Sequence, residues 1–252
     1  MNLSVVIITY NEERNIERCL LSVQELADEI LVVDSFSKDR TLEICKLFNA
    51  KVIQNPFEGH IQQKNFAVKQ AQFDWILSID ADEVLSDELI KSIKQIKSKE
   101  KPEVNLYEMN RLTNYCGSWV KHCGWYPDTK VRLVDRKFAK WGGVNPHDKL
   151  EGHKQEQVDF LKGDILHYSY YTKEDHLKQI EYFSKIAAGE LVKQGKNVAQ
   201  FTVYLKMATQ FFKSFVIKRG FLDGKTGWQI SKLSAFATYR KYSLLRTLNE
   251  TR

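Results

Sequence analysis

Three carboxylates stand close together directly after an apolar run. Residues 75–85 read WILSIDADEVL, so Asp80, Asp82 and Glu83 follow a run typical of a buried strand. Side chains two residues apart on an extended backbone point to the same side, as Asp80 and Asp82 would. Carboxylates facing one way repel each other unless a cation lies between them. Mg²⁺ and Mn²⁺ bind such carboxylates together with water and phosphate oxygens. The pattern therefore predicts a divalent-cation site that also holds a diphosphate.

Two other interpretations of this stretch are open. A solvated turn before a helix with an acidic first turn would explain Asp87 and Glu88, but it gives no reason for the two aspartates at the strand end. The string DADEV also resembles haloacid-dehalogenase-type phosphatases, in which Asp80 would be the nucleophile and Asp82 the acid/base. In those enzymes the motif follows the first strand, and an acidic pair lies further along the chain. This sequence has no Asp-Asp dipeptide, and its motif follows the fourth predicted strand.

The first hundred residues predict the frame that positions these acids. Apolar runs at 3–9, 29–34, 50–54 and 74–80 alternate with helical patterns, which indicates βαβ units and an open parallel sheet. We expect Asn11 to cap the first helix and Ser86 to cap the helix after the acidic motif. Ligands of such sheets bind beyond the carboxyl ends of the strands. Thr9, Asp34 and Asp80 each close a strand, so we expect them to gather at one edge.

The order of several motifs resembles the family-two glycosyltransferases. SVVIITYNEE, ILVVDSFSKDRT, QKNFAVKQA and WILSIDADE occur in the order and spacing of that family, and the similarity continues through WYPDTKVRLVDR, WGGVNPHDKLEG and LHYSY to FVIKRGFLDGKTGW. The set looks like the subgroup that adds sugars, often glucose, to the inner core of lipopolysaccharide. The resemblance implies an α/β GT-A nucleotide-diphospho-sugar fold, with an open mixed Rossmann-like sheet and a C-terminal helical extension.

The resemblance also implies a domain division and a donor site. Residues 1–170 would form the catalytic domain, with a nucleotide half over about 1–100 and an acceptor half over about 101–170, and residues 171–252 would form the helical extension. The donor would be a UDP-sugar, and the metal Mg²⁺ or Mn²⁺. Asp80 would touch ribose and metal, Asp82 would bind the metal directly, and His167 could complete the metal or diphosphate site. The remaining positions that match the family's nucleotide-sugar site are Thr9, Tyr10, Asn11, Glu12, Asp34, Lys64, Asn65 and Ala81.

A glycosyl transfer also needs a base that accepts the proton of the acceptor hydroxyl. Asp148, in VNPHDKL, stands where the subgroup has His-Glu, and it departs from that pattern because Pro146 precedes the histidine and Asp replaces Glu. Asp128, in YPDTK, is the rival base. The family generally inverts the anomeric centre, which implies a β-linked product. A non-catalytic sugar-nucleotide or membrane-binding module is the alternative, although the presence of Asp80, Asp82 and an acid at 148 favours an enzyme.

The excess positive charge lies at the C-terminal end. Residues 201–252 carry ten Lys or Arg against Asp223 and Glu250, whereas the first 200 residues have a net charge of −2. Ten aromatic residues accompany these cations at helical spacing. No nucleic-acid motif is present. Basic and aromatic helix faces fit peripheral docking on an anionic membrane, with a lipid-linked saccharide as the acceptor. Packing on the catalytic domain is the other interpretation of these faces.

The remaining composition suggests a cytoplasmic protein at the inner face of the cytoplasmic membrane. No run approaches the roughly 18 apolar residues of a membrane span, and the N-terminus lacks the features of an export signal. Cys19, Cys45, Cys116 and Cys123 lie in unrelated settings, as in a reduced cytosolic chain. Cys116, His122 and Cys123 lack a second ligand pair, which argues against zinc.

Overall fold

The computed structural model describes residues 1–144, 147–153 and 156–250. The chain divides into two compact units. The α/β unit comprises Met1–Arg111 and Asp128–Tyr168, and the helical unit comprises Leu112–Pro127 and Ser169–Arg252. The expected catalytic domain over 1–170 and extension over 171–252 differ from this division mainly because residues 112–127 group with the helices. The domain assignment itself stays a prediction.

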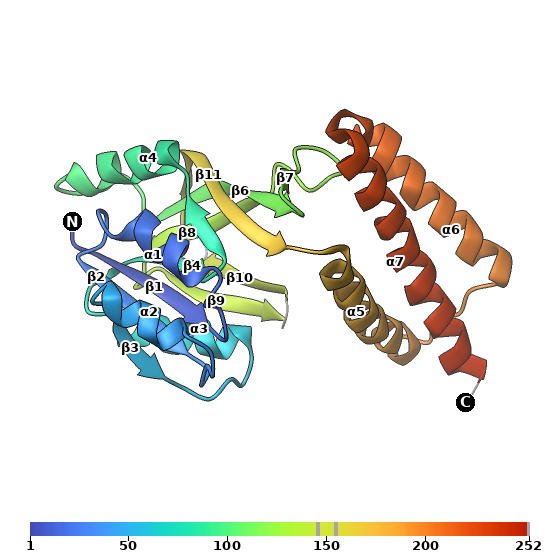
Figure 1. Ribbon diagram of the computed structural model, residues 1–252, viewed down its shortest axis with the longest axis horizontal. Coiled ribbons are helices and arrows are strands. Elements are labelled where there is room, and N and C mark those ends of the chain that lie inside the picture. Colours follow the sequence, from blue (N-terminus) through green and yellow to red (C-terminus); the bar gives the residue numbers. More distant parts are fainter. Residues whose placement is uncertain (145–146, 154–155, 251–252) are drawn as a thin grey trace. The chain divides into compact units, whose positions relative to one another are not determined.

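The α/β unit begins with four strand–helix repeats (Figure 1). The strands are β1 (Leu3–Thr9), β2 (Glu29–Asp34), β3 (Lys51–Gln54) and β4 (Trp75–Asp80), and the helices are α1 (Ile16–Val23), α2 (Thr41–Leu47), α3 (His60–Gln70) and α4 (Asp87–Ser98). The later strands are β5 (Glu83–Leu85), β6 (Leu106–Tyr115), β7 (Ser118–Trp119), β8 (Thr129–Asp135), β9 (Ala139–Val144), β10 (His147–Gly152) and β11 (Val158–Tyr170). The four predicted strands are therefore confirmed within one residue.

The strand order places a reversal beside β1. Across the described residues the main sheet runs β3-β2-β1-β4-β8-β6-β11-β5, with β7 paired to β6, and β9 and β10 form a separate ribbon. β1 pairs in parallel with both β2 and β4, and the register sets Thr9 against Asp34 and Ile8 against Asp80. From β1 to β3 each strand lies further out on one side of β1. The chain then returns, and β4 lies on the other side of β1. This switch point is where open α/β sheets bind ligands, so the expected gathering of Thr9, Asp34 and Asp80 is confirmed.

Two apolar layers hold this sheet. Alternate residues of β1 point to opposite faces, so Val5 and Ile7 join a core with α1, α2 and α4, while Val6 joins a second core. The second core contains Ala67 of α3 together with Trp141 of β9 and other side chains of the β9–β10 ribbon. Both faces of the parallel strands are thus covered, which explains their continuous β-branched runs.

Helix α4 begins at its predicted cap, whereas α1 does not. The hydroxyl of Ser86 accepts a hydrogen bond from the backbone N–H of Leu89, as a cap should. α1 begins only at Ile16, and Asn11 lies before it with φ of 54°. The Asn11 side chain instead accepts the backbone N–H of Lys38 at 2.8 Å. The predicted role of Asn11 as a helix cap is therefore wrong, because its amide joins the first loop to the loop after β2.

The helical unit consists mainly of three long helices. α5 (Lys173–Lys193), α6 (Gln200–Phe212) and α7 (Gly224–Glu250) are joined after α6 by a π-helical turn, η1 (Lys213–Ile217), and a 3₁₀ turn, η2 (Gly220–Asp223). Thr172 and Asp175 cap α5 reciprocally. His122 and Cys123, considered above for zinc, have other partners here: His122 Nδ1 lies 2.7 Å from Asp223, and the Cys123 thiol lies near the Ser231 hydroxyl. All four cysteines are free.

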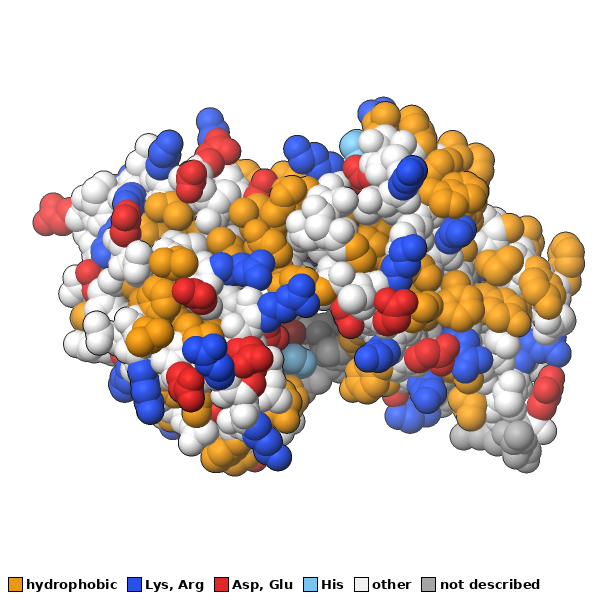
Figure 2. Space-filling view, viewed as in Figure 1, with side chains coloured by type: hydrophobic (Ala, Val, Ile, Leu, Met, Phe, Trp, Pro, Cys, Tyr) orange, Lys and Arg blue, Asp and Glu red, His pale blue; other side chains and the backbone are white. Residues whose placement is uncertain are grey.

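Large apolar side chains lie exposed on α6, on the turns after it and at the start of α7. Phe201 is 76% exposed and Ile217 62% exposed, and the other members of this set are Leu205, Phe212, Phe221, Leu222 and Trp228. Figure 2 shows hydrophobic side chains gathered over α6, with lysines and arginines among them. We call this set the apolar face. Within the described part of the chain, no helix is long and apolar enough to cross a membrane.

Candidate active site

A cavity of about 270 Å³ opens at the switch point of the sheet. Thr9, Tyr10 and Glu12 line it from the loop after β1, and Asp80, Ala81 and Asp82 line it from the end of β4. Five predicted nucleotide-sugar residues therefore share one cavity with the predicted metal residues Asp82 and His167. Sequence reasoning missed five further residues that line it, Ile8, Ser35, Phe57, His60 and Gln63. The ring of Phe57 packs edge-on against His60 at 5.1 Å between centroids, which provides an aromatic wall.

Asp82 and His167 meet in this cavity through strand pairing. β11 pairs antiparallel with β5, which sets His167 opposite Glu83, and the Tyr168 N–H donates to the Asp82 carbonyl at 2.9 Å. Nε2 of His167 then lies 3.1 Å from Oδ2 of Asp82. Burial disfavours a charged imidazole, but the Asp82 carboxylate raises the pKa of His167 above its ordinary value. The predicted proximity of His167 to the acidic motif is confirmed.

The Asp82–His167 pair fits a divalent cation. A carboxylate and an imidazole nitrogen are both ligand types for divalent ions, and at 3.1 Å from each other Asp82 and His167 are the side chains that would hold one. Among the described residues, no three His, Cys, Asp or Glu side chains form a group able to hold a metal. Mg²⁺ usually keeps several waters and binds through one or two carboxylates plus substrate phosphates. A diphosphate and water would therefore complete the coordination.

Lys64 joins the end of β4 to β10. Its Nζ lies 2.9 Å from Oδ1 of Asp80 and 2.8 Å from Oδ2 of Asp148, and its side chain is only 5% exposed. The ammonium also lies 4.3 Å from the ring centroid of Trp141. Burial alone would raise the pKa of Asp80, but Lys64 and Arg132 lower it far below the ordinary value. Asp80 is therefore ionised, and the predicted base Asp148 is fixed beside it.

A second cavity, of about 450 Å³, lies on the Asp148 side of this junction. Asp80 lines both cavities, whereas Lys64, Trp141 and Asp148 line only the second. Arg111, Lys130 and Arg132 add cations to its wall, and Glu108 adds an acid. The geometry thus provides two adjoining binding spaces that share one carboxylate.

Glu83 and Arg132 form a buried ion pair that sequence reasoning did not assign to the site. Glu83 is fully buried, and its Oε1 accepts from Arg132 at 3.0 Å while its Oε2 accepts the backbone N–H of Asp80 at 3.0 Å. Arg132 reaches Asp80 as well, at 3.5 Å. The third carboxylate of the motif therefore orients Asp80. Arg132 lies in a strand-like stretch of the sequence. A charged residue in such a stretch is only a weak sequence signal that it belongs to a site.

Asp128, the rival base, is held by two cations. Its Oδ2 accepts from Arg111 at 2.8 Å, and its Oδ1 pairs with Lys130 at 2.8 Å. Burial opposes ionisation, but these neighbours lower the pKa of Asp128 below the ordinary value. Asp128 lines neither of the two cavities, although both of its partners line the second. The geometry therefore favours Asp148 over Asp128 as the proton acceptor.

Two predicted donor-site residues, Asp34 and Asn65, make hydrogen bonds within the protein, and their contact with a nucleotide stays a prediction. Asp34 is fully buried and accepts hydrogen bonds from the Ser37 N–H at 2.9 Å and the Gln54 amide at 3.2 Å, so it organises the loop that carries Ser35 into the cavity. Asn65 exchanges hydrogen bonds with the backbone of Trp141 at 2.9 and 3.1 Å, which fixes α3 to β9. Pro146 lies outside the described residues, as does the side chain of His147.

Comparison with known proteins identifies the fold and the class of chemistry. The model of the family described as glycosyl transferase family 2 matches residues 4–135. The chain belongs to this family. An uncharacterised glycosyltransferase of Rickettsia typhi is 36% identical over 98% of the chain and 87% of the relative. This family membership establishes the chain as a glycosyltransferase with a GT-A sheet, and it decides against the phosphatase alternative.

Two more distant proteins resemble the glycosyltransferase over its whole length. The lipopolysaccharide core biosynthesis glycosyltransferase LpsC of Rhizobium meliloti is 23% identical over 96% of the chain and 93% of LpsC. The solved structure of residues 1–349 of S. aureus TarS is 17% identical, with a TM-score of 0.47 over 100% of this chain and 91% of that one. TarS has also been solved with UDP-GlcNAc.

Glu12, which lines the cavity at the switch point, makes the stability of the folded protein depend on pH. Burial, followed by the charges of Asp82, Asp39 and Asp80, raises the pKa of Glu12 from 4.5 to about 7, although a hydrogen bond from Asn15 lowers it. Between these two pH values the unfolded chain loses the Glu12 proton while the folded protein keeps it. The folded state therefore loses stability from this group as the pH rises through that window.

We predict that Glu12→Gln, which keeps the Asn15 hydrogen bond, has the wild-type melting temperature near pH 4.5. Above pH 7 its melting temperature should exceed that of the wild type by about 2 °C or more, because the variant lacks the buried charge. Thermal unfolding from pH 4 to 8 in metal-free buffer measures this difference. Glu17→Gln, at an exposed position on α1, is the control. A difference that stays constant with pH would contradict the buried-carboxyl interpretation.

Proposed function

We propose that the glycosyltransferase moves a hexose, glucose in the first instance, from a UDP-sugar to a saccharide acceptor with inversion at the anomeric carbon. The observation that carries this proposal is the junction of the two cavities at Asp80, with Asp148 in the second. A UDP-sugar in the first cavity would place its diphosphate at Asp80 and Asp82. The acceptor would then approach from the second cavity, on the side of the sugar opposite the leaving group.

Asp148 would act as the general base. The acceptor hydroxyl attacks the anomeric carbon, its proton moves to the Asp148 carboxylate, and the bond from that carbon to the UDP oxygen breaks. The Lys64 ion pair uses Oδ2 of Asp148, which leaves Oδ1 for the proton. Lys64 and Arg132 provide buried positive charge beside the departing diphosphate. A divalent cation bound at Asp82 and His167 would offset the same developing charge.

A lipopolysaccharide core or another lipid-linked glycan is the proposed acceptor. The sequence motifs resemble the subgroup that acts on the inner core, and LpsC, which resembles the chain along most of its length, is named for core biosynthesis. Such an acceptor lies in a membrane, whereas sugar nucleotides are made in the cytosol. We therefore place the enzyme at the inner face of the cytoplasmic membrane.

The apolar face on α6 and its following turns would supply the membrane contact. Its exposed side chains are interspersed with Lys213, Lys218, Arg219 and Lys225. The nearby acid Asp223 contacts His122, and among the described residues it makes no ion pair with these cations. Inserted apolar side chains with cations at the headgroups are the pattern of reversible interfacial binding. A non-catalytic sugar-nucleotide or membrane-binding module would share these features but would not turn over a donor.

Removal of the metal-binding carboxylate should abolish metal-dependent donor binding. We predict that Asp82→Ala shows no increase in UDP affinity on addition of Mn²⁺ and no transfer, because the diphosphate loses its main counter-ion. Calorimetric titration of UDP with and without Mn²⁺ measures the effect. Asp87→Ala, an exposed acid at the start of α4, should behave as the wild type. Full turnover of the wild type in EDTA would eliminate the metal role.

The base is tested by separating turnover from binding. Asp148→Asn should lower kcat by roughly a hundredfold or more, the scale of general-base loss, while UDP affinity stays near that of the wild type. Asp128→Asn should lower kcat by less than about tenfold, because Asp128 lies outside both cavities. The opposite pattern would make Asp128 the base. Donor binding without turnover of any acceptor or of water by the wild type would favour the non-catalytic module.

Membrane contact should depend on lipid charge and on salt. We predict sedimentation with vesicles that contain anionic lipid, little with neutral vesicles, and release at high salt, since each cation near the surface is worth about 1 kcal/mol. Replacing Lys213, Lys218, Arg219 and Lys225 by Gln should abolish sedimentation and leave UDP affinity unchanged. The charge-matched control replaces four exposed lysines of the α/β unit, Lys46, Lys69, Lys91 and Lys101. Equal loss in both variants would exclude a specific face.

A further inference from the structure

A cavity of about 390 Å³ lies within the helical unit, at the connection between α5 and α6. Leu191, Val198 and Leu245 give it an apolar lining, and Lys196, Lys206 and Tyr242 give it a polar side. Its volume falls in the range of small-molecule sites, about 300–1,000 Å³. None of these residues lies in the α/β unit, so the cavity has no part in the proposed transfer reaction.

The cations of this cavity lack acidic partners. Lys206 Nζ lies 4.9 Å from the ring centroid of Tyr242, and Lys241 Nζ lies 4.7 Å from the same centroid. In the described part of the chain, no acid lies within ion-pair distance of Lys196, Lys206 or Lys241. The acids nearest in sequence already have other partners: Glu181 with Arg240, Glu190 with Lys193, and Glu250 with Arg246. Lys206 lines the cavity and Lys241 does not, so an anion in the cavity would meet the uncompensated ammonium group of Lys206.

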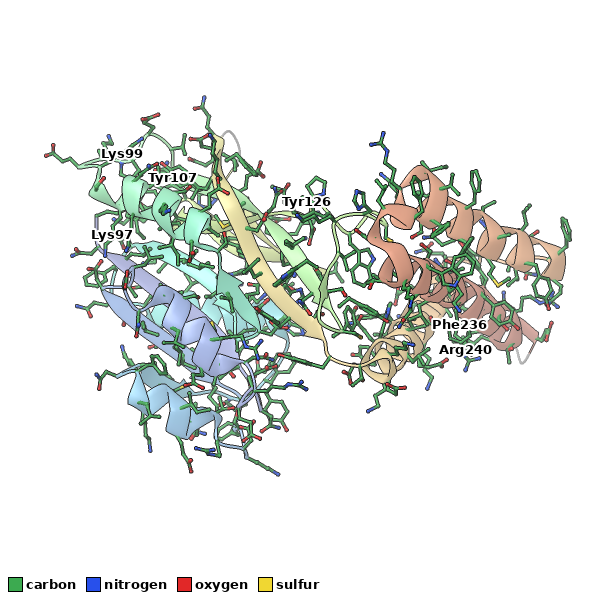
Figure 3. All side chains as sticks on the ribbon, turned by 45° about the horizontal axis from the view of Figure 1, so that its top comes forward. Lys97, Lys99, Tyr107, Tyr126, Phe236 and Arg240 are labelled. Carbon is green, nitrogen blue, oxygen red and sulfur yellow. The ribbon has the colours of Figure 1, made fainter. Side chains whose placement is uncertain are left out.

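Arg240 shows why the nearby acids cannot serve as that anion. It lies on α7 one turn after Phe236, both labelled in Figure 3, and its Nε donates to Glu181 of α5 at 2.7 Å. Glu181 is thereby held by a cation of its own. The positive charge at Tyr242 is consequently available to a ligand rather than compensated within the bundle.

The inner wall of the cavity is apolar. Ala188, Val192 and Leu245 form a buried cluster, against which Leu191, Val198 and Tyr242 pack. A free phosphate would find cations at the polar side but would leave this wall without a partner. A ligand that joins an anionic head to a hydrocarbon chain would satisfy both parts of the lining.

We propose that this cavity binds one molecule of an anionic phospholipid, with its phosphate at Lys206 and Lys196 and part of an acyl chain against Leu191, Val198 and Leu245. The position on α6 agrees with such a ligand. Thr202 and Lys206, one turn apart, line the cavity, and Phe201 and Leu205, the residues just before them, belong to the apolar face. Under the proposed membrane contact, a lipid could enter without leaving the bilayer; the pocket itself does not rest on that contact.

Binding of a soluble short-chain lipid tests the proposal without membranes or donor. The full-length chain is titrated with dihexanoyl phosphatidylglycerol below its micelle concentration, with calorimetry as the readout. We expect saturable binding of one molecule per chain, at least tenfold weaker binding of dihexanoyl phosphatidylcholine, and no saturable binding of inorganic phosphate. Equal affinity for the two lipids, or phosphate bound as tightly as the anionic lipid, would overturn the proposal.

Variants locate the site. Lys206→Gln removes a cation and Thr202→Phe fills the cavity, and each should weaken phosphatidylglycerol binding at least tenfold. Lys232→Gln is the matched control, because Lys232 lies 5.9 Å from the ring centroid of Trp228 and does not line the cavity. Unchanged binding in the first two variants, or equal loss in the control, would refute the assignment. UDP affinity and turnover are measured on the same proteins, so failure here is distinguishable from failure of the glycosyl transfer.

Discussion

The structure depends on compensation of the negative charge that the end of β4 concentrates. Asp80, Glu83 and Asp148 lie near one another with little access to water, and an isolated buried carboxylate costs several kcal/mol. Lys64 bridges Asp80 and Asp148, and Arg132 bridges Glu83 and Asp80. Removal of one partner from such a network costs about 3–5 kcal/mol, because the other charge stays buried. Lys64 therefore joins α3 to β4 and β10, and Arg132 joins β8 to β4 and β5.

This compensation is incomplete on the side of the donor cavity, which matters for function. Lys64, Arg132 and Arg111 lie beside Asp80, Glu83 and Asp148. Among the described residues, by contrast, only His167 lies within ion-pair distance of Asp82, which faces the cavity. The raised pKa of Glu12 has the same origin, since burial acts together with the charges of Asp82, Asp39 and Asp80. A site with residual negative charge attracts a divalent cation, and the cation in turn attracts a diphosphate. In the proposed reaction, Lys64 and Arg132 would lie beside the charge that develops on the leaving group, without rearrangement of solvent.

Local patterns predicted the frame of the site, and long-range pairing decided the detail. Continuous apolar runs marked β1, β2 and β4, and the rule for strand ends brought Thr9, Asp34 and Asp80 to one edge. The partners of Lys64 lie 16 and 84 residues away, and no periodicity specifies such contacts. Asn65 and Asp34 are predicted to lie at the nucleotide, and no local pattern indicates the hydrogen bonds that they make with Trp141, Ser37 and Gln54. Glu83 was recognised as an acid of the motif, yet its role depends on Arg132, which only the pairing of β4 with β8 brings close.

In the helical unit, the sequence pattern predicts the apolar side of each helix but not whether that side is buried. Apolar residues at helical spacing normally indicate a face that packs against a core, and Ile180, Ala188 and Leu245 follow that rule. Phe201, Leu205 and Phe212 have similar spacing, but within this unit they remain largely exposed. The spacing of apolar residues predicts that a helix has an apolar side, but it does not predict what covers that side. Charge supplies a further distinction. Lys193 and Arg240, beside the buried stripe of α5, pair with Glu190 and Glu181, whereas the cations beside the exposed stripe of α6 have no acidic partner among the described residues. An apolar surface bordered by uncompensated positive charge is suited to a partner that is itself apolar within and anionic at its surface, which is the physical description of a bilayer.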